Sequence, residues 1–208
     1  TCAYTYTASA SVIAHVGATI VLVDTYKDTP QLNYDALEAA ITEKTKAIMV
    51  VHYAGVGANM EVIMDIAKRH NLKVIEDAAQ VANSVYHGQY LGTFGDVGCF
   101  SFHETKNYSM GEGGAVSIND ESLIDRAAMV REKGTNRTQF INGQVDKYTW
   151  VDAGSSYLPS ELNAAYLWGQ LEAERQIFDD RMSSWNRYYA GLKELADKGH
   201  IDLPVIPE

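Results

Sequence analysis

The sequence predicts an α/β protein whose mostly parallel sheet is covered by helices on both faces. Short runs of apolar, often β-branched residues alternate with segments whose apolar residues recur at helical spacing. The apolar runs are nearly continuous, which is typical of strands buried on both sides of a sheet. With 208 residues, 46% of them apolar, the chain is long enough to bury a sizeable core.

The first part of the chain begins with a helix followed by a strand. A segment of small residues closed by Gly17 predicts the helix, and the β-branched run 19–24 predicts the strand. Apolar residues at helical spacing predict a helix over 34–41, and the apolar run 47–53 predicts another strand. The segment 60–69 is helical again, because its apolar residues fall on one face.

Three more strands and a helix follow by the same criteria. Apolar runs predict strands over 73–77, 97–103 and 114–118, and helical spacing predicts a helix over 121–133. The segment 134–149 is polar and shows no periodicity. We therefore expect a loop there, long enough to carry function.

The C-terminal part is helical from 160 to about 196, which is longer than most helices of globular proteins. This length predicts a break in the helix or a helix that leaves the domain. We expect a partial large domain over 1–159 and, over 160–208, a long helix with the start of a second domain. Because the first residue is Thr and the sequence ends before another helix–strand unit is complete, we expect a piece of a longer protein, truncated at both ends.

Charge and composition disfavour several classes of function. The net charge of −10 argues against non-specific binding to nucleic acid or to an anionic membrane, and no apolar run approaches the length of a membrane span. The only cysteines, Cys2 and Cys99, are expected to be reduced thiols in a cytoplasmic protein. The six histidines show no spacing typical of metal ligands, so we expect no metal site.

Two residues with complementary chemistry follow neighbouring predicted strands. Asp77 ends the strand 73–77, and Lys106 comes just after the strand 97–103. Ligands collect at the carboxyl ends of parallel strands, so we expect the two side chains to share a site. A pyridoxal phosphate site needs this pair, since an amine bonds the cofactor's aldehyde carbon and a carboxylate faces the pyridine nitrogen. Only the neutral amine attacks, and apolar neighbours such as Phe100 favour that form.

Each of these residues has a structural alternative when it is considered alone. Asp77 also suits the cap of a following helix, because Asp commonly accepts from free backbone N–H groups. Most lysines, like Lys106, are solvated surface residues. Their joint placement at the ends of two strands favours the functional interpretation.

Several motifs closely resemble the DegT/StrS group of pyridoxal phosphate-dependent sugar aminotransferases, and the resemblance covers nearly the whole chain. The stretches that carry it are 52–55, 76–80, 100–108, 131–137, 143–150 and 154–158. It implies the three-layer α/β/α large domain of a fold-type I pyridoxal phosphate-dependent transferase. The family's phosphate-binding segment at a helix N-terminus would precede residue 1.

The resemblance also implies roles for single residues. Lys106 would bond the cofactor and carry the proton, and Asp77 would pair with the pyridinium nitrogen. Gln80 would lie near the ring hydroxyl, and Ser101 would donate to the phosphate. Tyr6 corresponds to the aromatic residue that stacks on the ring.

Other candidates rest on weaker signals. His103 is a candidate for a phosphate or substrate contact, and a packed histidine at a strand end is an equal alternative. The segment 126–147 holds five basic residues against two acidic ones, so Arg137 and Lys147 are candidates for the substrate's diphosphate. A solvated helix end and loop is the alternative there. Tyr108 is a further candidate for substrate binding.

The resemblance implies transamination at C4 of a nucleotide-linked 4-keto-6-deoxy sugar. The expected amino donor is glutamate and the expected product is dTDP-4-amino-4,6-dideoxygalactose, used in bacterial cell-surface polysaccharide, lipopolysaccharide or antigen biosynthesis. It further implies a homodimer with shared active sites.

Proteins of related fold also carry other activities. A regulatory protein of the same fold that binds the cofactor without turnover is the alternative. A dehydratase on this scaffold typically has histidine in place of Lys106, which argues against that activity. A plain nucleotide-binding domain is disfavoured, because no Gly-x-Gly-x-x-Gly segment follows a strand.

Overall fold

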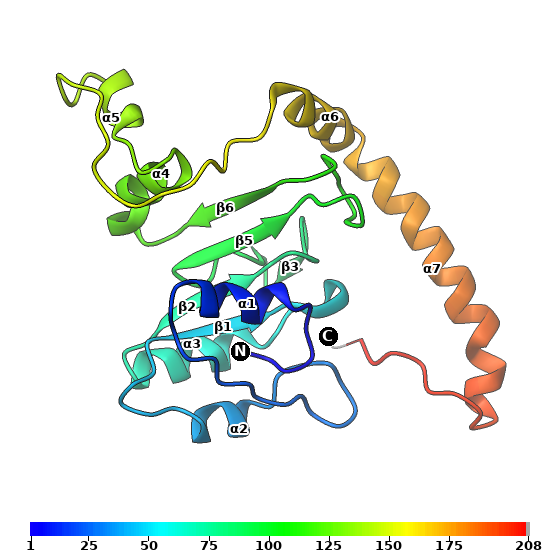
Figure 1. The fold of residues 1–208 in the computed structure, drawn as a ribbon. Helices are drawn as coiled ribbons and strands as arrows, with labels where there is room; N and C mark the ends of the chain where they lie inside the picture. The colour runs from blue at the N-terminus through cyan, green and yellow to red at the C-terminus, as the bar shows by residue number, and fades with distance from the viewer. Residues whose placement is uncertain (207–208) are drawn as a thin grey trace.

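The computed structural model describes residues 1–206 and has a four-stranded sheet at its centre (Figure 1). The strand order is β1-β2-β5-β6, with β1–β2 and β2–β5 parallel and β5–β6 antiparallel. The strands are β1 (Ala47–Val51), β2 (Lys73–Asp77), β5 (Val97–Ser101) and β6 (Gly114–Ile118). The predicted α/β class with a mostly parallel sheet is therefore confirmed.

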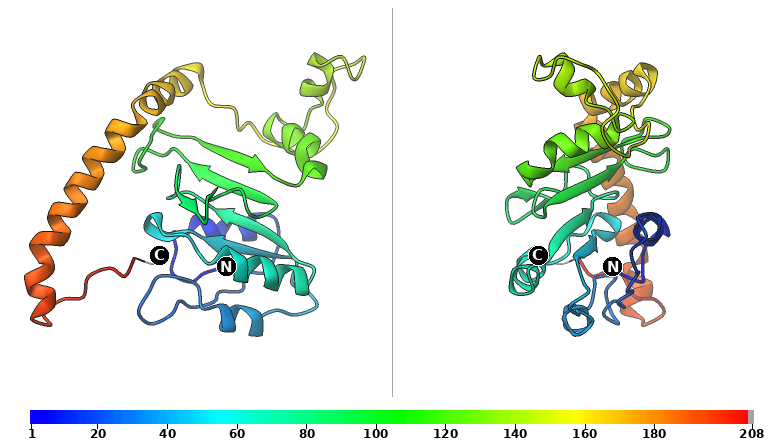
Figure 2. Two further views of the ribbon diagram at one scale, coloured as in Figure 1. Left: turned by 180° about the vertical axis from the view of Figure 1, so that it is seen from behind. Right: turned by 60° about the vertical axis from the view of Figure 1, so that its left-hand side comes forward.

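Helices lie on both faces of this sheet, as the second view of Figure 2 shows for α1 (Ala8–His15) and α3 (Met60–Arg69). Side chains alternate between the two faces along each strand. In β2, Val74 and Glu76 are fully buried, whereas Ile75 and Asp77 line a cleft on the other face, to which α1 contributes. Asp77 therefore lies on the face of the sheet that α1 covers.

The core lies on the α3 side of the sheet. α3 begins at Asn59, whose side chain accepts a hydrogen bond from the backbone N–H of Val62. Its residues Ile63 and Ile66 are at most 2% exposed and belong to the same buried cluster as Val74. Burying an isoleucine side chain contributes roughly 1.5–3 kcal/mol, so this face anchors β2 firmly.

Most of the remaining elements follow the predicted order. They are α2 (Tyr34–Ala39), η1 (Tyr53–Gly55), β3 (Val85–Tyr86), β4 (Gln89–Tyr90), η2 (Glu121–Leu123), α4 (Ile124–Arg131), α5 (Arg137–Ile141), α6 (Glu161–Glu172) and α7 (Glu174–Asp197). The predicted helices over 34–41, 60–69 and 121–133 are confirmed, the last as η2 followed by α4.

Three segments differ from the prediction. The run 19–24 is not a regular strand: only the short start of the chain lies beside it, and the pairing is a single bridge between Cys2 and Val23. The segment 134–149 is not wholly a loop, because α5 forms within it. The hairpin of β3 and β4 was not predicted, since strands of two residues have no apolar run.

The long C-terminal helical region breaks at Ala173, between α6 and α7, as its length predicted. Neither helix has a buried residue, and α7 extends away from the sheet (Figure 1). None of the helices in residues 1–206 combines the length and the hydropathy needed to cross a membrane.

Gly98 lies where β5 passes closest to the loop before it. A Cβ atom at this position would overlap the carbonyl oxygen of Gly92 and the hydroxyl of Ser117. Gly98→Ala is therefore expected to lower the free energy of unfolding by about 1–3 kcal/mol, measured by urea denaturation of the full-length protein. Gly191→Ala in α7 is the control, because no atom lies within 4 Å of the added methyl. Equal midpoints for the two variants would contradict the close approach at Gly98.

Candidate active site

A cleft of about 1020 Å³ opens on the α1 side of the sheet, where β1, β2 and β5 end. The chain before α1, the three strand ends and the turn that contains Lys106 all contribute to its walls. Six of the predicted site residues line it: Tyr6, Asp77, Gln80, Ser101, His103 and Lys106. The cleft thus brings together residues from both ends of a stretch of about one hundred positions.

Asp77 is the last residue of β2, and both of its carboxylate oxygens are held. The Oγ atom of Ser9 donates to Oδ2 at 2.6 Å, and the backbone N–H of Ala79 donates to Oδ1 at 3.2 Å. No helix forms between 77 and 85, so the Ala79 contact belongs to a turn and not to a helix cap. The structure therefore does not support the capping alternative for Asp77.

Lys106 lies in the turn after β5, where its backbone N–H donates to the carbonyl of His103 at 2.9 Å. Its half-buried side chain lines the cleft and also borders a smaller hollow of about 680 Å³ beside α6. The side chain of Gln170 in α6 exchanges two hydrogen bonds with the backbone of Ser109, of 3.0 and 2.9 Å. Asn163 donates to the carbonyl of Met110 at 2.5 Å. α6 therefore holds the chain that follows the lysine.

Gln80 and Ser101 present hydrogen-bond donors at the cleft. Oε1 of Gln80 accepts from the backbone N–H of Ala54 at 2.7 Å, which leaves its amide N–H groups as donors. Oγ of Ser101 accepts from the backbone N–H of His103 at 3.3 Å, which leaves its hydroxyl hydrogen for another acceptor. Both groups therefore suit a ligand that carries oxygen acceptors.

Tyr6 and His103 differ in how firmly they are held. The side chain of Tyr6 is 74% exposed at the cleft, so its ring is open to a flat ligand. Nδ1 of His103 lies 2.9 Å from Oγ1 of Thr105, and its Nε2 lies 3.5 Å from Oε1 of Glu112. His103 thus has partners within the chain on both ring nitrogens.

Three candidates for substrate binding do not line the cleft. Tyr108 is only 5% exposed, because the chain folds back after Lys106 and turns its side chain inward. Arg137 forms an ion pair with the buried Glu132 at 2.9 Å, so its guanidinium contacts a residue close to it in the sequence. The side chain of Lys147 is exposed. The structure gives no support to Tyr108 as a substrate contact, and the roles of Arg137 and Lys147 stay predictions.

Sequence reasoning missed Ser9, Tyr4 and Tyr53. The rings of Tyr4 and Tyr53 pack at a centroid distance of 4.8 Å and form one wall of the cleft. Ser9 reaches Asp77 from a helix 68 positions earlier in the chain. The only local signal for Ser9 was its spacing of four residues from Thr5, and this spacing does not identify Asp77 as its partner.

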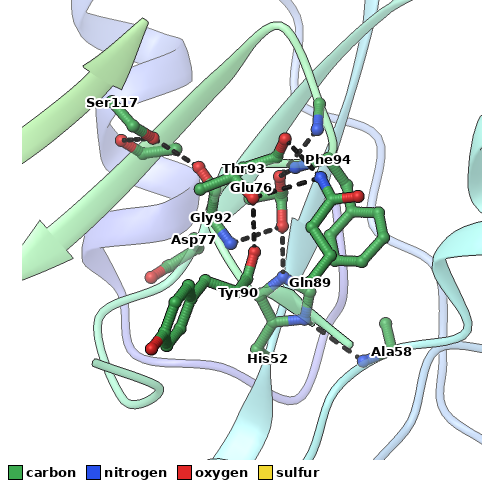
Figure 3. A network of polar contacts seen from close by, with 12 residues as sticks. His52, Ala58, Glu76, Asp77, Gln89, Tyr90, Gly92, Thr93, Phe94 and Ser117 are labelled. Carbon is green, nitrogen blue, oxygen red and sulfur yellow. Dashed lines mark hydrogen bonds and ion pairs between the residues drawn. The ribbon is translucent and has the colours of Figure 1, made fainter. Parts of the chain in front are cut away.

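A buried polar network stands behind Asp77, on the opposite face of β2 (Figure 3). Glu76 is fully buried and accepts four hydrogen bonds. The donors are Nε2 of His52 at 2.9 Å and the backbone N–H groups of Gly92, Phe94 and Gly95, each at 2.7 Å. The carboxylate therefore binds the loop that follows β4 to the middle of the sheet.

The protonation states of this pair follow from its partners. Nδ1 of His52 accepts from the backbone N–H of Ala58 at 3.1 Å, so the ring carries its hydrogen on Nε2 and donates it to Glu76. Burial raises the pKa of Glu76, but the bonds from His52, Gly95 and Gly92 together outweigh it and hold the pKa below its ordinary value. Glu76 is thus an ionised acceptor facing a neutral histidine.

Comparison with known proteins gives one family. The model of the DegT/DnrJ/EryC1/StrS aminotransferase family matches residues 1–207. GDP-perosamine synthase of Escherichia coli O157:H7 is 38% identical over 204 residues, which are 94% of this chain and 54% of that protein.

Solved structures agree with that result. An aminotransferase from Psychrobacter cryohalolentis superimposes with a TM-score of 0.88 at 30% identity, over 97% of this chain and 52% of that one. A Streptococcus pneumoniae protein named as a sugar aminotransferase, solved in its PLP-form, gives a TM-score of 0.81 at 31% identity, over 92% and 53%. The chain spans about half the length of the relatives it matches.

Proposed function

The chain belongs to the DegT/DnrJ/EryC1/StrS aminotransferase family, and we propose that the full-length protein transfers an amino group to a nucleotide-linked keto sugar. The proposed cofactor is pyridoxal 5′-phosphate. One observation carries the proposal: Asp77 and Lys106, a held carboxylate and an amine, line the same cleft at the ends of β2 and β5.

The residues of the cleft fit this cofactor. Asp77 has both oxygens fixed by donors, which suits an acceptor for the protonated ring nitrogen. The N–H groups of Gln80 suit the oxygen of the ring hydroxyl, and the hydroxyl of Ser101 suits a phosphate oxygen. The open ring of Tyr6 suits stacking on a pyridine. His103 is a further candidate for a phosphate contact.

When bound, pyridoxal phosphate supplies an electron sink for the carbon that loses its proton. Lys106 Nζ, when neutral, takes the proton from Cα of the amino donor and later returns a proton at C4 of the sugar. The Asp77 carboxylate keeps the proton on the pyridine nitrogen. The packed rings of Tyr4 and Tyr53 form one wall of the cleft.

We extend the proposal to the reaction at C4 of a 4-keto-6-deoxy sugar with glutamate as the donor. The motif resemblance favours a dTDP-linked substrate, with dTDP-4-amino-4,6-dideoxygalactose as the product. The name of the Escherichia coli relative supports a nucleotide-linked sugar and carries a GDP group instead. The proposed assembly is a cytoplasmic homodimer with shared active sites. Arg137 and Lys147 are proposed to bind the diphosphate of the substrate.

A substrate panel tests this function. The full-length protein is incubated with cofactor, glutamate and either a dTDP-linked or a GDP-linked 4-keto-6-deoxyhexose, and the amino sugar is measured by mass spectrometry. We expect an amino sugar from the dTDP substrate with the higher kcat/KM. Bound cofactor without an amino sugar from either substrate would contradict an enzyme and favour a regulatory protein of the same fold.

A further inference from the structure

We propose that Thr5 and Ser9 are positioning residues for the reaction, forming a hydrogen-bond relay that fixes the orientation of the Asp77 carboxylate. This inference rests on the proposed function, because it concerns the carboxylate that would face the cofactor. It assigns a role to one polar side chain just before α1 and one in its first turn.

The geometry of the relay begins with Ser9. This residue is only 3% exposed, although serines are mostly found at protein surfaces. Its Oγ donates to Oδ2 of Asp77 at 2.6 Å, which is the length of a charge-assisted O–H···O bond. The contact joins the first helix to the end of β2 across 68 positions of the chain.

The direction of the relay follows from counting hydrogens. Ser9 has a single hydroxyl hydrogen, and that hydrogen goes to Asp77. The 2.8 Å contact between Oγ1 of Thr5 and Oγ of Ser9 must therefore use the hydrogen of Thr5. Thr5 thus donates to Ser9, and Ser9 donates to Asp77, so that each hydrogen bond polarises the next. Such a relay holds Oδ2 of Asp77 in one position at the cleft.

The other neighbours of Asp77 do not compete with the relay. Its second oxygen, Oδ1, is held by the N–H of Ala79. Its neighbour across the sheet, Cys99, is not a competing anion: burial, and then the charge of Asp77, raise the pKa of that thiol. The relay and the Ala79 contact together therefore hold the orientation of the one carboxylate that reaches the cleft from β2.

The test measures cofactor binding by equilibrium titration in the full-length protein, without turnover. Ser9→Ala is expected to raise the dissociation constant of pyridoxal phosphate roughly 10- to 100-fold, by analogy with the loss of metal affinity when the hydrogen-bond partner that orients a metal ligand is removed. Ser9→Thr keeps the hydroxyl and should stay within about threefold of the wild type. Ser11→Ala is the matched control on α1, because its hydroxyl contacts only the carbonyl of Ala8 at 3.3 Å.

A double mutant tests the direction. Thr5→Val should weaken binding less than Ser9→Ala, and it should have no further effect once Ser9 is alanine, because Thr5 acts only through Ser9. Additive effects, or a Ser9→Ala variant that binds like the wild type, would overturn the relay. If Ser9→Ala fails to fold, Thr5→Val and Ser9→Thr decide the question. A wild type that binds no pyridoxal phosphate would instead overturn the proposed function.

Discussion

Lys106→Ala is expected to lower the rate of amino transfer by roughly 10⁴-fold or more. General acid–base catalysis alone accounts for about 10²–10⁴-fold, and the variant also loses the amine that bonds the cofactor. The rate is measured from the formation of amino sugar under saturating substrate. Because the side chain is only half buried at the edge of the cleft, the variant should unfold at nearly the same temperature as the wild type.

Two further variants separate chemistry from charge. Lys106→Arg keeps the positive charge but offers no neutral amine, so it should be as inactive as alanine. Lys68→Ala removes an exposed lysine from α3, which lies on the opposite face of the sheet from the cleft, and should keep full activity. Turnover by Lys106→Ala close to that of the wild type would exclude this lysine as the proton carrier.

Glu76→Gln is expected to have the largest effect on stability. The glutamine amide has one oxygen acceptor where the carboxylate has two. Its N–H groups would face the backbone N–H groups that donate to Glu76 in the wild type. Leaving a buried donor without its acceptor costs about 1–3 kcal/mol, and this change disturbs several donors at once, so the free energy of unfolding should fall by about 3 kcal/mol or more at neutral pH. Urea denaturation of the full-length protein measures the change.

The pH dependence of this effect has a definite sign. The pKa of Glu76 in the folded protein lies below its ordinary value of 4.5. The bonds to the carboxylate therefore stabilise the fold above about pH 4.5, and this stabilisation is lost as the pH falls toward the folded-state pKa. The difference between wild type and Glu76→Gln should accordingly shrink below pH 4.5.

Glu61→Gln serves as the control for this variant. Its carboxylate is 72% exposed and pairs only with His87, at 3.0 Å, so the change should alter stability by less than about 1 kcal/mol. A constant difference between wild type and Glu76→Gln from pH 7 to pH 3 would contradict the ionised state assigned to Glu76.

Strand ends were the part of the site that the sequence could predict. Asp77 and Lys106 each follow an apolar run, and parallel strands bring such ends to one edge of the sheet. The strands 73–77 and 114–118 and the helix 60–69 agree with the structure at both ends, because the apolar pattern of each begins and ends where the element does. Local pattern was sufficient there.

Contacts between distant segments were beyond such reasoning. The alternation of β2 places Glu76 against the core, but nothing near it in the sequence identifies His52 or the loop after β4 as its partners. The Ser9 contact with Asp77 depends in the same way on how α1 crosses the sheet. The run 19–24 shows the converse, since an apolar pattern forms a strand only where a neighbouring strand pairs with it.

Borohydride reduction tests the central claim most directly. The full-length protein is loaded with pyridoxal phosphate, reduced, digested, and the modified peptide is identified by mass spectrometry. We predict a reduced cofactor attached to Lys106, in the peptide that contains Thr105 and Asn107, and none on the Lys106→Ala variant. Attachment to another lysine in the wild type, or no attachment at all, would contradict the assignment of this cleft as the active site.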